Sequence, residues 1–211
     1  LGYLKINRFS QTTFDEFELA LSNLLSMGME KLILDLRDNP GGYLHPAIQI
    51  SNTFLRKDQT IVITKSNNGE KAKSLAEGDG NFQEGNLVVL VNGQSASASE
   101  IVAGAIQDND RGWIIGRRTF GKGLVQQQMP LGGGDAIRLT IAKYFTPTGR
   151  SIQKPYNGNR EDYYQDLNNR YHKGELADVE KIPIADSLAF ETPSGRTVFG
   201  GGGIMPDFYI P

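Results

Sequence analysis

The sequence predicts an α/β fold in which a mostly parallel sheet is covered by helices. Short apolar segments alternate with segments of helical periodicity through the first half of the chain. Glycine is frequent, at 25 of 211 residues, which favours tight turns over long helices. Polar turns of unusual composition follow two of the apolar segments. In parallel sheets ligand sites form at the carboxyl ends of strands, so these two turns meet at a site if their strands are neighbours.

The elements of the first half follow from apolar periodicity. The first helix is predicted to start at Thr13, as N-cap with Glu16 completing a capping box, and to stop at Gly28. Apolar runs predict strands, and 3.6-residue periodicity predicts two further helices. The strands fall at residues 3–7, 32–36, 60–64, 86–92 and 113–116, and one helix at 44–54. The other helix follows the serines, with Ile101, Val102, Ala105 and Ile106 on one side. The polar stretch 66–85 predicts a loop or hairpin.

The second half differs in character. Two strands are expected at residues 122–131 and 136–145, joined across three glycines at 132–134. A polar excursion of loops and a short helix follows at about 150–190, and additional strand and extended segments close the chain. We expect residues 1–211 to form a single domain carrying this excursion.

Composition excludes several classes of function. The chain has no cysteine, so thiol catalysis, disulfides and cysteine metal sites are excluded. A net charge of −2 gives no reason to expect a nucleic-acid or membrane-surface partner. No apolar run is long enough to span a bilayer. The abrupt strand-like start suggests a piece of a longer precursor.

Three serines at alternate positions, Ser95, Ser97 and Ser99, stand between an apolar strand and a predicted helix. Serine is a favoured N-cap residue, so a helix start explains the pattern by itself. A nucleophilic serine here would have the positive potential and free amides of a helix N-terminus available for an oxyanion. The NPGG turn at residues 39–42 offers a second set of backbone N–H groups. Local sequence leaves both interpretations open.

A nucleophilic serine needs a base to accept its proton. There are two histidines: His172 falls in the polar excursion, and His45 follows the NPGG turn with no serine-elbow pattern near it. A Ser-His-Asp triad stays open but has little support from the sequence. The other choice is a neutral lysine buried beside the serine. Lys122 lies between two glycines after Phe120, and on a strand it would share a face with Gln126. From this pattern alone, a strand lysine with its amine in solvent is the simpler explanation.

Together, these segments resemble the carboxyl-terminal processing peptidases, also called tail-specific proteases. The serine block and the lysine block are the most specific parts of the resemblance, which covers nearly the whole chain. The polar stretch near residues 155–195 lies outside the aligned blocks. Those blocks are GYLKINRFSQTTFDEFELAL (2–21), LILDLRDNPGG (32–42), LVNGQSASASEIVAGAIQDNDRG (90–112), GRRTFGKGLVQ (116–126), YFTPTGRSIQ (144–153) and GGIMPD (202–207).

The resemblance implies a Ser/Lys dyad. Ser97, the middle serine, would be the nucleophile, and Lys122, 25 residues downstream, the general base. Gln126 falls on the family's glutamine and would position the lysine amine. Ser95 would then be a turn residue that shapes the approach to the helix, and Ser99 a first-turn packing or cap residue.

The resemblance also implies an oxyanion hole and a fold. The backbone N–H of Ala98 would act with that of a glycine in the NPGG turn, and we favour Gly41 over Gly42. The implied fold is a crotonase-like, ClpP-like spiral core with additional C-terminal β-strands. No metal or cofactor is required.

The activity implied is that of a serine endopeptidase that cuts polypeptides with apolar C-termini near those ends, through an acyl-enzyme. Such peptidases usually carry a PDZ domain, which this chain does not contain and the full-length protein could supply. Their usual setting, the periplasm or cell envelope of a bacterium, is expected here. One alternative is a non-catalytic binding module resembling the retinoid-binding repeats of the same fold. A weaker one is a crotonase-type acyl-CoA enzyme, which would not need the lysine and glutamine block.

Overall fold

The computed structural model describes residues 1–156, 160–182 and 186–211. Its centre is a five-stranded sheet in the order β1-β2-β5-β6-β11, and every neighbouring pair in it is parallel. β2 and β5 are therefore neighbours, as the site prediction required. The strands are β1 (Gly2–Lys5), β2 (Lys31–Asp35), β5 (Asn86–Val91), β6 (Trp113–Gly116) and β11 (Phe208–Tyr209).

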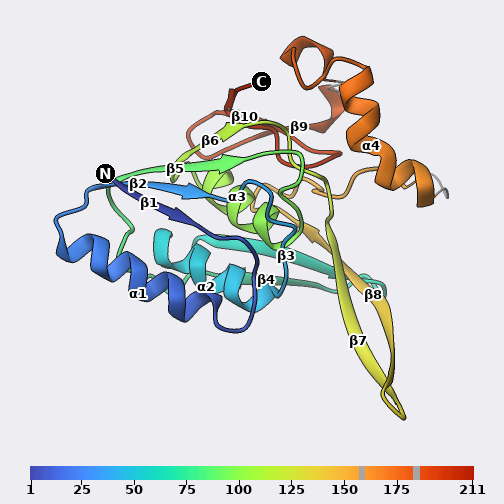
Figure 1. Cartoon of the computed structure of the whole chain (residues 1–211), viewed down its shortest axis with the longest axis horizontal. Helices are drawn as coiled ribbons and strands as arrows, with labels where there is room; N and C mark the ends of the chain where they lie inside the picture. The colour runs from blue at the N-terminus through green and yellow to red at the C-terminus, as the bar shows by residue number, and fades with distance from the viewer. Residues whose placement is uncertain (157–159, 183–185) are drawn as a thin grey trace.

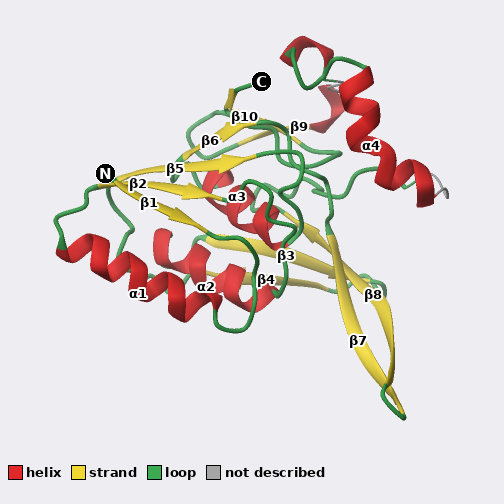
Figure 2. Cartoon of the chain, in the orientation of Figure 1, coloured by secondary structure: helices red, strands yellow, loops and turns green. Residues whose placement is uncertain are grey.

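A second, antiparallel sheet has the order β4-β3-β8-β7. Its strands are β3 (Thr60–Ser66), β4 (Lys71–Leu75), β7 (Leu124–Gly132) and β8 (Asp135–Phe145). Within β8, only the last residues, from Ala142 to Phe145, pair with β3. The outer parts of β7 and β8 therefore have no third strand, and they project from the body as a long arm (Figure 2).

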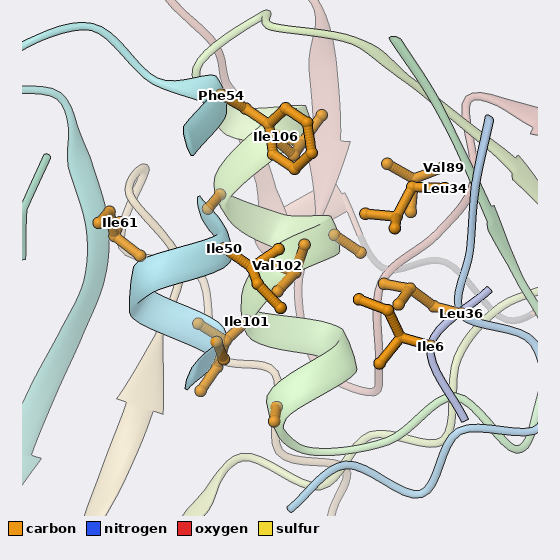
Figure 3. Close-up of a cluster of buried hydrophobic side chains, with 14 of the residues drawn as sticks. Ile6, Leu34, Leu36, Ile50, Phe54, Ile61, Val89, Ile101, Val102 and Ile106 are labelled. Carbon is orange, nitrogen blue, oxygen red and sulfur yellow. The ribbon is translucent and has the colours of Figure 1, made fainter. Parts of the chain in front are cut away.

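Three helices complete the body: α1 (Thr13–Ser26), α2 (Leu44–Phe54) and α3 (Ala98–Asp108). α2 and α3 lie between the five-stranded sheet and β3 (Figure 1). Every residue of α3 is buried, so this helix is the centre of the core. Apolar side chains from both sheets and both helices meet there, as Figure 3 shows for Leu34, Val89, Ile50, Val102, Ile106 and Ile61. Each such side chain contributes about 2 kcal/mol on burial.

The segment after β8 carries helix α4 (Arg160–His172), two short 3-10 helices, Val179–Lys181 and Asp186–Leu188, and a small hairpin. The hairpin pairs β9 (Ala189–Glu191) with β10 (Thr197–Phe199). α4 lies beyond the end of the sheet toward which β5 points (Figure 1). Residues 157–159 and 183–185 of the predicted polar excursion lie outside the described residues.

The predicted α/β class with a parallel sheet and covering helices is confirmed. The helix at 44–54 and the strand at 113–116 have the predicted bounds, and the polar stretch 66–85 contains β4 in a hairpin with β3. The predicted N-cap Thr13 is wrong, because Thr12 occupies that position and bonds Glu16. Thr13 is buried, and its hydroxyl instead donates to the Arg8 carbonyl. In the described residues, no helix could cross a membrane.

Candidate functional site

The two unusual turns meet at the carboxyl ends of β2 and β5. The Leu36 amide donates to the Leu90 carbonyl at 2.9 Å, which continues the strand pairing into the turns. The Asn39 carbonyl then accepts both the Ala96 amide at 3.0 Å and the Ser99 hydroxyl at 3.0 Å. The NPGG turn and the serine block are therefore joined by direct hydrogen bonds, at the edge of the sheet where the sequence predicted a site.

The three serines occupy different environments. Ser95 and Ser99 are fully buried, and both hydroxyls donate to backbone carbonyls of the neighbouring turn, at Leu36 and Asn39. Ser97 is partly exposed and is the N-cap residue of α3. Its φ of +55° lies in the region that non-glycine residues rarely adopt, and such strain is concentrated at functional sites. Of the three hydroxyl groups, the one at Ser97 is the most accessible to a substrate.

Gly41 of the NPGG turn lies directly against Ser97, whereas Gly42 lies against the backbone of Phe9. A Cβ built on Gly41, whose φ is +91°, would come within 2.8 Å of the Ser97 Cβ and of the Ala98 nitrogen. The Gly41 amide donates to Asn39 Oδ1 at 2.9 Å, so that N–H group is already engaged. Among the described residues, the amides of Ala98 and Gly42 have no hydrogen-bond acceptor. The two unengaged N–H groups at this turn are therefore those of Ala98 and Gly42.

A buried carboxylate anchors the start of the NPGG turn. Asp35, the last residue of β2, accepts two hydrogen bonds from the Arg37 guanidinium, at 2.9 and 2.7 Å, and one from the Tyr3 hydroxyl at 2.6 Å. Burial alone would raise the pKa of Asp35, but the hydrogen bonds from Arg37 and Tyr3 outweigh it and lower the pKa to about 2. The carboxylate thus stays charged and holds β1 and the turn together.

A second carboxylate, Glu100, joins the serine block to the lysine block. It is fully buried in the first turn of α3, and its oxygens accept the amides of Ser97 at 2.8 Å, Gly121 at 2.7 Å and Lys122 at 2.8 Å. The Thr119 hydroxyl is a fourth donor at 2.6 Å. Burial raises the pKa of Glu100, while these hydrogen bonds act in the opposite direction. Sequence reasoning missed this residue, although a glutamate three positions after an N-cap serine is a capping-box pattern.

Lys122 is partly buried, and close contacts explain the two glycines that flank it. A Cβ on Gly121, at φ +89°, would come within 3.0 Å of Lys154 Cβ, and one on Gly123 within 2.6 Å of the Gln153 nitrogen. The segment is also tied to the serine block, because the Phe120 amide donates to the Ser95 carbonyl at 3.0 Å. Only glycine lets the backbone pass through this space.

The predicted strand face shared by Lys122 and Gln126 is wrong. β7 begins at Leu124, so Lys122 precedes the strand. The register also shifts between Val125 and Gln126, which interrupts the alternation of side chains. Gln126 is exposed and pairs across the strands with Thr140.

Both histidines lie on helices other than α3. His45 is exposed in the first turn of α2, and His172 is exposed at the end of α4 beside the Tyr171 ring. In the described ranges, no three histidine, aspartate or glutamate side chains cluster as a metal site would require.

The model of peptidase family S41 matches residues 1–164. The chain belongs to peptidase family S41. The carboxy-terminal-processing protease of Bartonella bacilliformis is 44% identical over 161 residues, which cover 72% of this chain and 36% of that protein. The carboxyl-terminal-processing protease of Synechocystis is 44% identical over 154 residues, 73% of this chain and 36% of that protein. The resemblance predicted from the sequence blocks is confirmed.

Solved structures agree with membership of S41. A photosystem II D1 C-terminal processing protease is 36% identical with a TM-score of 0.65, and the match covers 72% of this S41 chain and 39% of that one. A lipoprotein from Streptococcus agalactiae shares the fold at 16% identity and a TM-score of 0.59, over 99% of this chain and 61% of the other. The S41 chain spans just over a third of the length of the curated relatives it matches.

Proposed function

We propose that this chain is the catalytic core of a serine endopeptidase that cuts polypeptides near their C-terminal ends. One observation carries the proposal. The partly exposed Ser97 faces the glycine turn, and a single buried carboxylate, Glu100, accepts the amides of both Ser97 and Lys122. The serine and lysine blocks, separated in sequence, are thereby joined at one place. Membership of S41 and the similarity to carboxyl-terminal processing proteases support the same activity.

In the proposed mechanism, the Ser97 oxygen attacks the scissile carbonyl carbon while its proton passes to the uncharged amine of Lys122. The oxyanion of the tetrahedral intermediate accepts hydrogen bonds from two backbone amides, each worth about 3 kcal/mol. The C–N bond then breaks, and Lys122 returns the proton to the leaving amine. Water hydrolyses the acyl-enzyme and restores Ser97.

We assign the oxyanion donors to Ala98 and a glycine of the NPGG turn. The family resemblance favours Gly41, but the Gly41 amide donates to Asn39, whereas the amides of Ala98 and Gly42 have no acceptor among the described residues. This difference supports Gly42 as the second donor. We assign Gln126 as the residue that positions the Lys122 amine, because it matches the glutamine of the family motif.

We propose the fold type, the substrate class, the recruiting domain and the compartment from the resemblance to the family. We assign the α/β core to the crotonase-like, ClpP-like type. The substrates are polypeptides with apolar C-termini, recruited in the full-length protein by a PDZ domain. The expected compartment is the bacterial periplasm or cell envelope. The structural relative is itself described as a C-terminal processing protease, which agrees with this substrate class.

The direct test is cleavage of an unfolded protein by Ser97→Ala and Lys122→Ala. Each should lower kcat by roughly a thousandfold or more, because the nucleophile or its base is removed. The matched controls are Ser22→Ala and Lys143→Ala, which remove an exposed serine of α1 and an exposed lysine of β8. Full activity in both test variants would refute the dyad, and full activity in Lys122→Ala alone would place the base elsewhere.

Covalent labelling separates a peptidase from a binding module of the same fold. A serine-reactive phosphonate should form an adduct at Ser97 in the wild-type chain and none in Ser97→Ala. A binding module needs no activated serine, so absence of labelling in a folded wild-type chain would favour that alternative.

A further inference from the structure

Helix α4 contacts both halves of the proposed site, although most of it lies beyond residue 164, where the family match ends. Leu167 packs on the serine block so closely that a Cβ built on Gly93 would come within 2.5 Å of its Cδ2. One turn further, Arg170 reaches the segment that leads into Lys122. Residues three apart share a helix face, so one face of α4 covers both blocks.

The Arg170 guanidinium donates to three successive carbonyls. It is 2% exposed, and it reaches the oxygens of Arg118 at 3.3 Å, Thr119 at 2.9 Å and Phe120 at 3.3 Å. Its charge is balanced by Asp166 at 2.8 Å on the same helix and by Glu175 at 3.8 Å. A buried arginine with several planar donors can hold a stretch of backbone that a lysine, with one ammonium group, cannot span.

The same stretch is held from its other side by Glu100. The peptide group between Phe120 and Gly121 has its carbonyl bonded to Arg170 and its N–H bonded to Glu100, at 2.7 Å. The two ends of a trans peptide point in opposite directions, so this plane cannot rotate without losing one of the bonds. The following amide, of Lys122, is also bonded to Glu100. The backbone that carries Lys122 is thus fixed between the buried Arg170 guanidinium and the buried Glu100 carboxyl group.

A second arginine strengthens the attachment. Arg118 makes two hydrogen bonds to the Glu175 carboxylate, at 2.8 and 2.7 Å, just after α4. Glu175 is itself buried, and its carbonyl accepts the Tyr209 hydroxyl at 2.6 Å. These contacts join residues 166–175 to residues 118–120 by charged, largely desolvated groups, which form the stronger kind of hydrogen bond.

We infer that Arg170 is a positioning residue for the proposed reaction: it fixes residues 118–120 and thereby the backbone of Lys122. This inference rests on the proposed function, in which Lys122 is the general base. α4 is then a part of the catalytic apparatus that the S41 motifs do not contain. Loss of the guanidinium should free the lysine segment, misplace the base and lower turnover while substrate binding is kept.

The test uses Arg170→Met in the full chain, which removes all five donors and keeps the aliphatic stem. Hydrogen exchange of the amides of Gly121 and Lys122 should be at least tenfold faster than in the wild type. kcat on an unfolded protein should fall at least tenfold, and KM should stay within twofold. Arg170→Lys keeps the pairs with Asp166 and Glu175 but cannot reach three carbonyls, so it should show the same changes if Arg170→Met does not fold.

The matched control is Arg111→Met. The Arg111 guanidinium also donates to several backbone carbonyls, those of Phe54, Phe82, Glu84 and Gly85, but these belong to the end of α2 and to the loop before β5. A general loss of stability would appear in both variants, whereas faster exchange at 121–122 and the loss of kcat should appear only at Arg170. Unchanged exchange at 121–122 overturns the inference, and so does a kcat no lower than that of the control. The exchange measurement does not depend on catalysis, so it stands even if Lys122→Ala retains full activity and the dyad is refuted.

Discussion

Ser97 has a backbone conformation that a serine adopts only when its surroundings impose it. A positive φ at a residue other than glycine costs about 1–3 kcal/mol. Hydrogen bonds on both sides of the residue offset this free energy. The hydroxyls of Ser95 and Ser99 donate to the neighbouring turn, and the Ser97 amide donates to Glu100. The flanking serines therefore maintain the geometry in which the middle serine can act.

The close approach of Gly41 to Ser97 leads to a substitution test. In Gly41→Ala, the new Cβ would come within 2.5 Å of the Ala96 carbonyl and 2.8 Å of the Ala98 nitrogen. These neighbours are backbone atoms, which cannot move aside as the end of a flexible side chain can. The serine turn must therefore move. We expect kcat on an unfolded protein to fall by roughly a hundredfold or more, since misplacement by about 1 Å has that effect.

Gly69 supplies the control for this prediction. Its φ of +92° matches the +91° of Gly41, but a Cβ there would meet no atom within 4 Å. Gly69→Ala therefore carries the same backbone penalty without the collision. Gly69→Ala should lower the free energy of unfolding in urea by about as much as backbone strain alone lowers it in Gly41→Ala. It should keep full activity. Equal activity in the two variants would contradict the close packing of Gly41 against the serine turn.

Among the elements, α3 contributes most to the position of the proposed nucleophile. Its first turn presents the Ala98 amide and the positive end of the helix dipole beside Ser97. The helix is buried along its whole length, with Gly104 so close to Thr146 that a Cβ would lie 2.9 Å from its methyl carbon. Ser97 therefore stands at the start of a helix that is buried along its whole length.

The β7–β8 arm is the opposite case. The part of β8 that precedes Ala142 pairs with β7 but has no third strand beside it. Apolar side chains on this arm are exposed, including Met129, Leu131 and Ile137. Isolated two-stranded hairpins are marginally stable. We expect amides of residues 127–138 to exchange with solvent roughly tenfold or more faster than those of 142–145, by hydrogen exchange on the intact chain. Equal protection in the two segments would mean that something covers the arm in solution.

At the scale of the whole molecule, the α/β class with a mostly parallel sheet could be predicted from the sequence, and so could the end of the sheet that carries the site. That the polar turns after β2 and β5 meet depended on these strands being neighbours, which the structure shows and the apolar runs alone do not. The cap of α1 was predicted one residue too late, because Thr12 and Thr13 are equally good caps and only the packing of Thr13 decides between them.

The roles of Glu100 and α4 could not be predicted in the same way. The bonds of Glu100 to Gly121 and Lys122 span more than 20 residues, and local spacing shows only a helix cap. The composition of residues 150–190 is polar, which predicts solvent exposure. Arg170 and Glu175 are nevertheless buried, because Asp166 and the carbonyls of residues 118–120 pair with Arg170, and Arg118 pairs with Glu175. Pairing between distant charges leaves no periodic signal in a sequence.

The stability of the whole chain should depend on pH through Asp35. Its pKa is about 2 when folded, against an ordinary value of 3.8, so its stabilisation is fully present above pH 4 and is lost as pH falls toward 2. The difference corresponds to about 2 kcal/mol of unfolding free energy. Urea unfolding should therefore show Asp35→Asn less stable than the wild type at pH 6, with the two converging near pH 2.

Asp15→Asn, which removes an exposed carboxylate from α1, is the control for this measurement and should follow the wild-type curve. A constant gap between the wild type and Asp35→Asn from pH 6 to pH 2 would show that the stabilisation does not come from ionisation of the Asp35 carboxyl group.

The complete burial of α3 has a consequence for how this protein can change. Ser97 takes its place from the core, so a substitution that disturbs it also weakens the fold and is removed along with unstable chains. Lys122 takes its place from Glu100 and also from contacts outside the apolar core, at residues 118–120 and 166–175. Substitutions there can alter turnover and leave the core untouched. Variation that adjusts the rate of such an enzyme would therefore accumulate on the lysine side of the site.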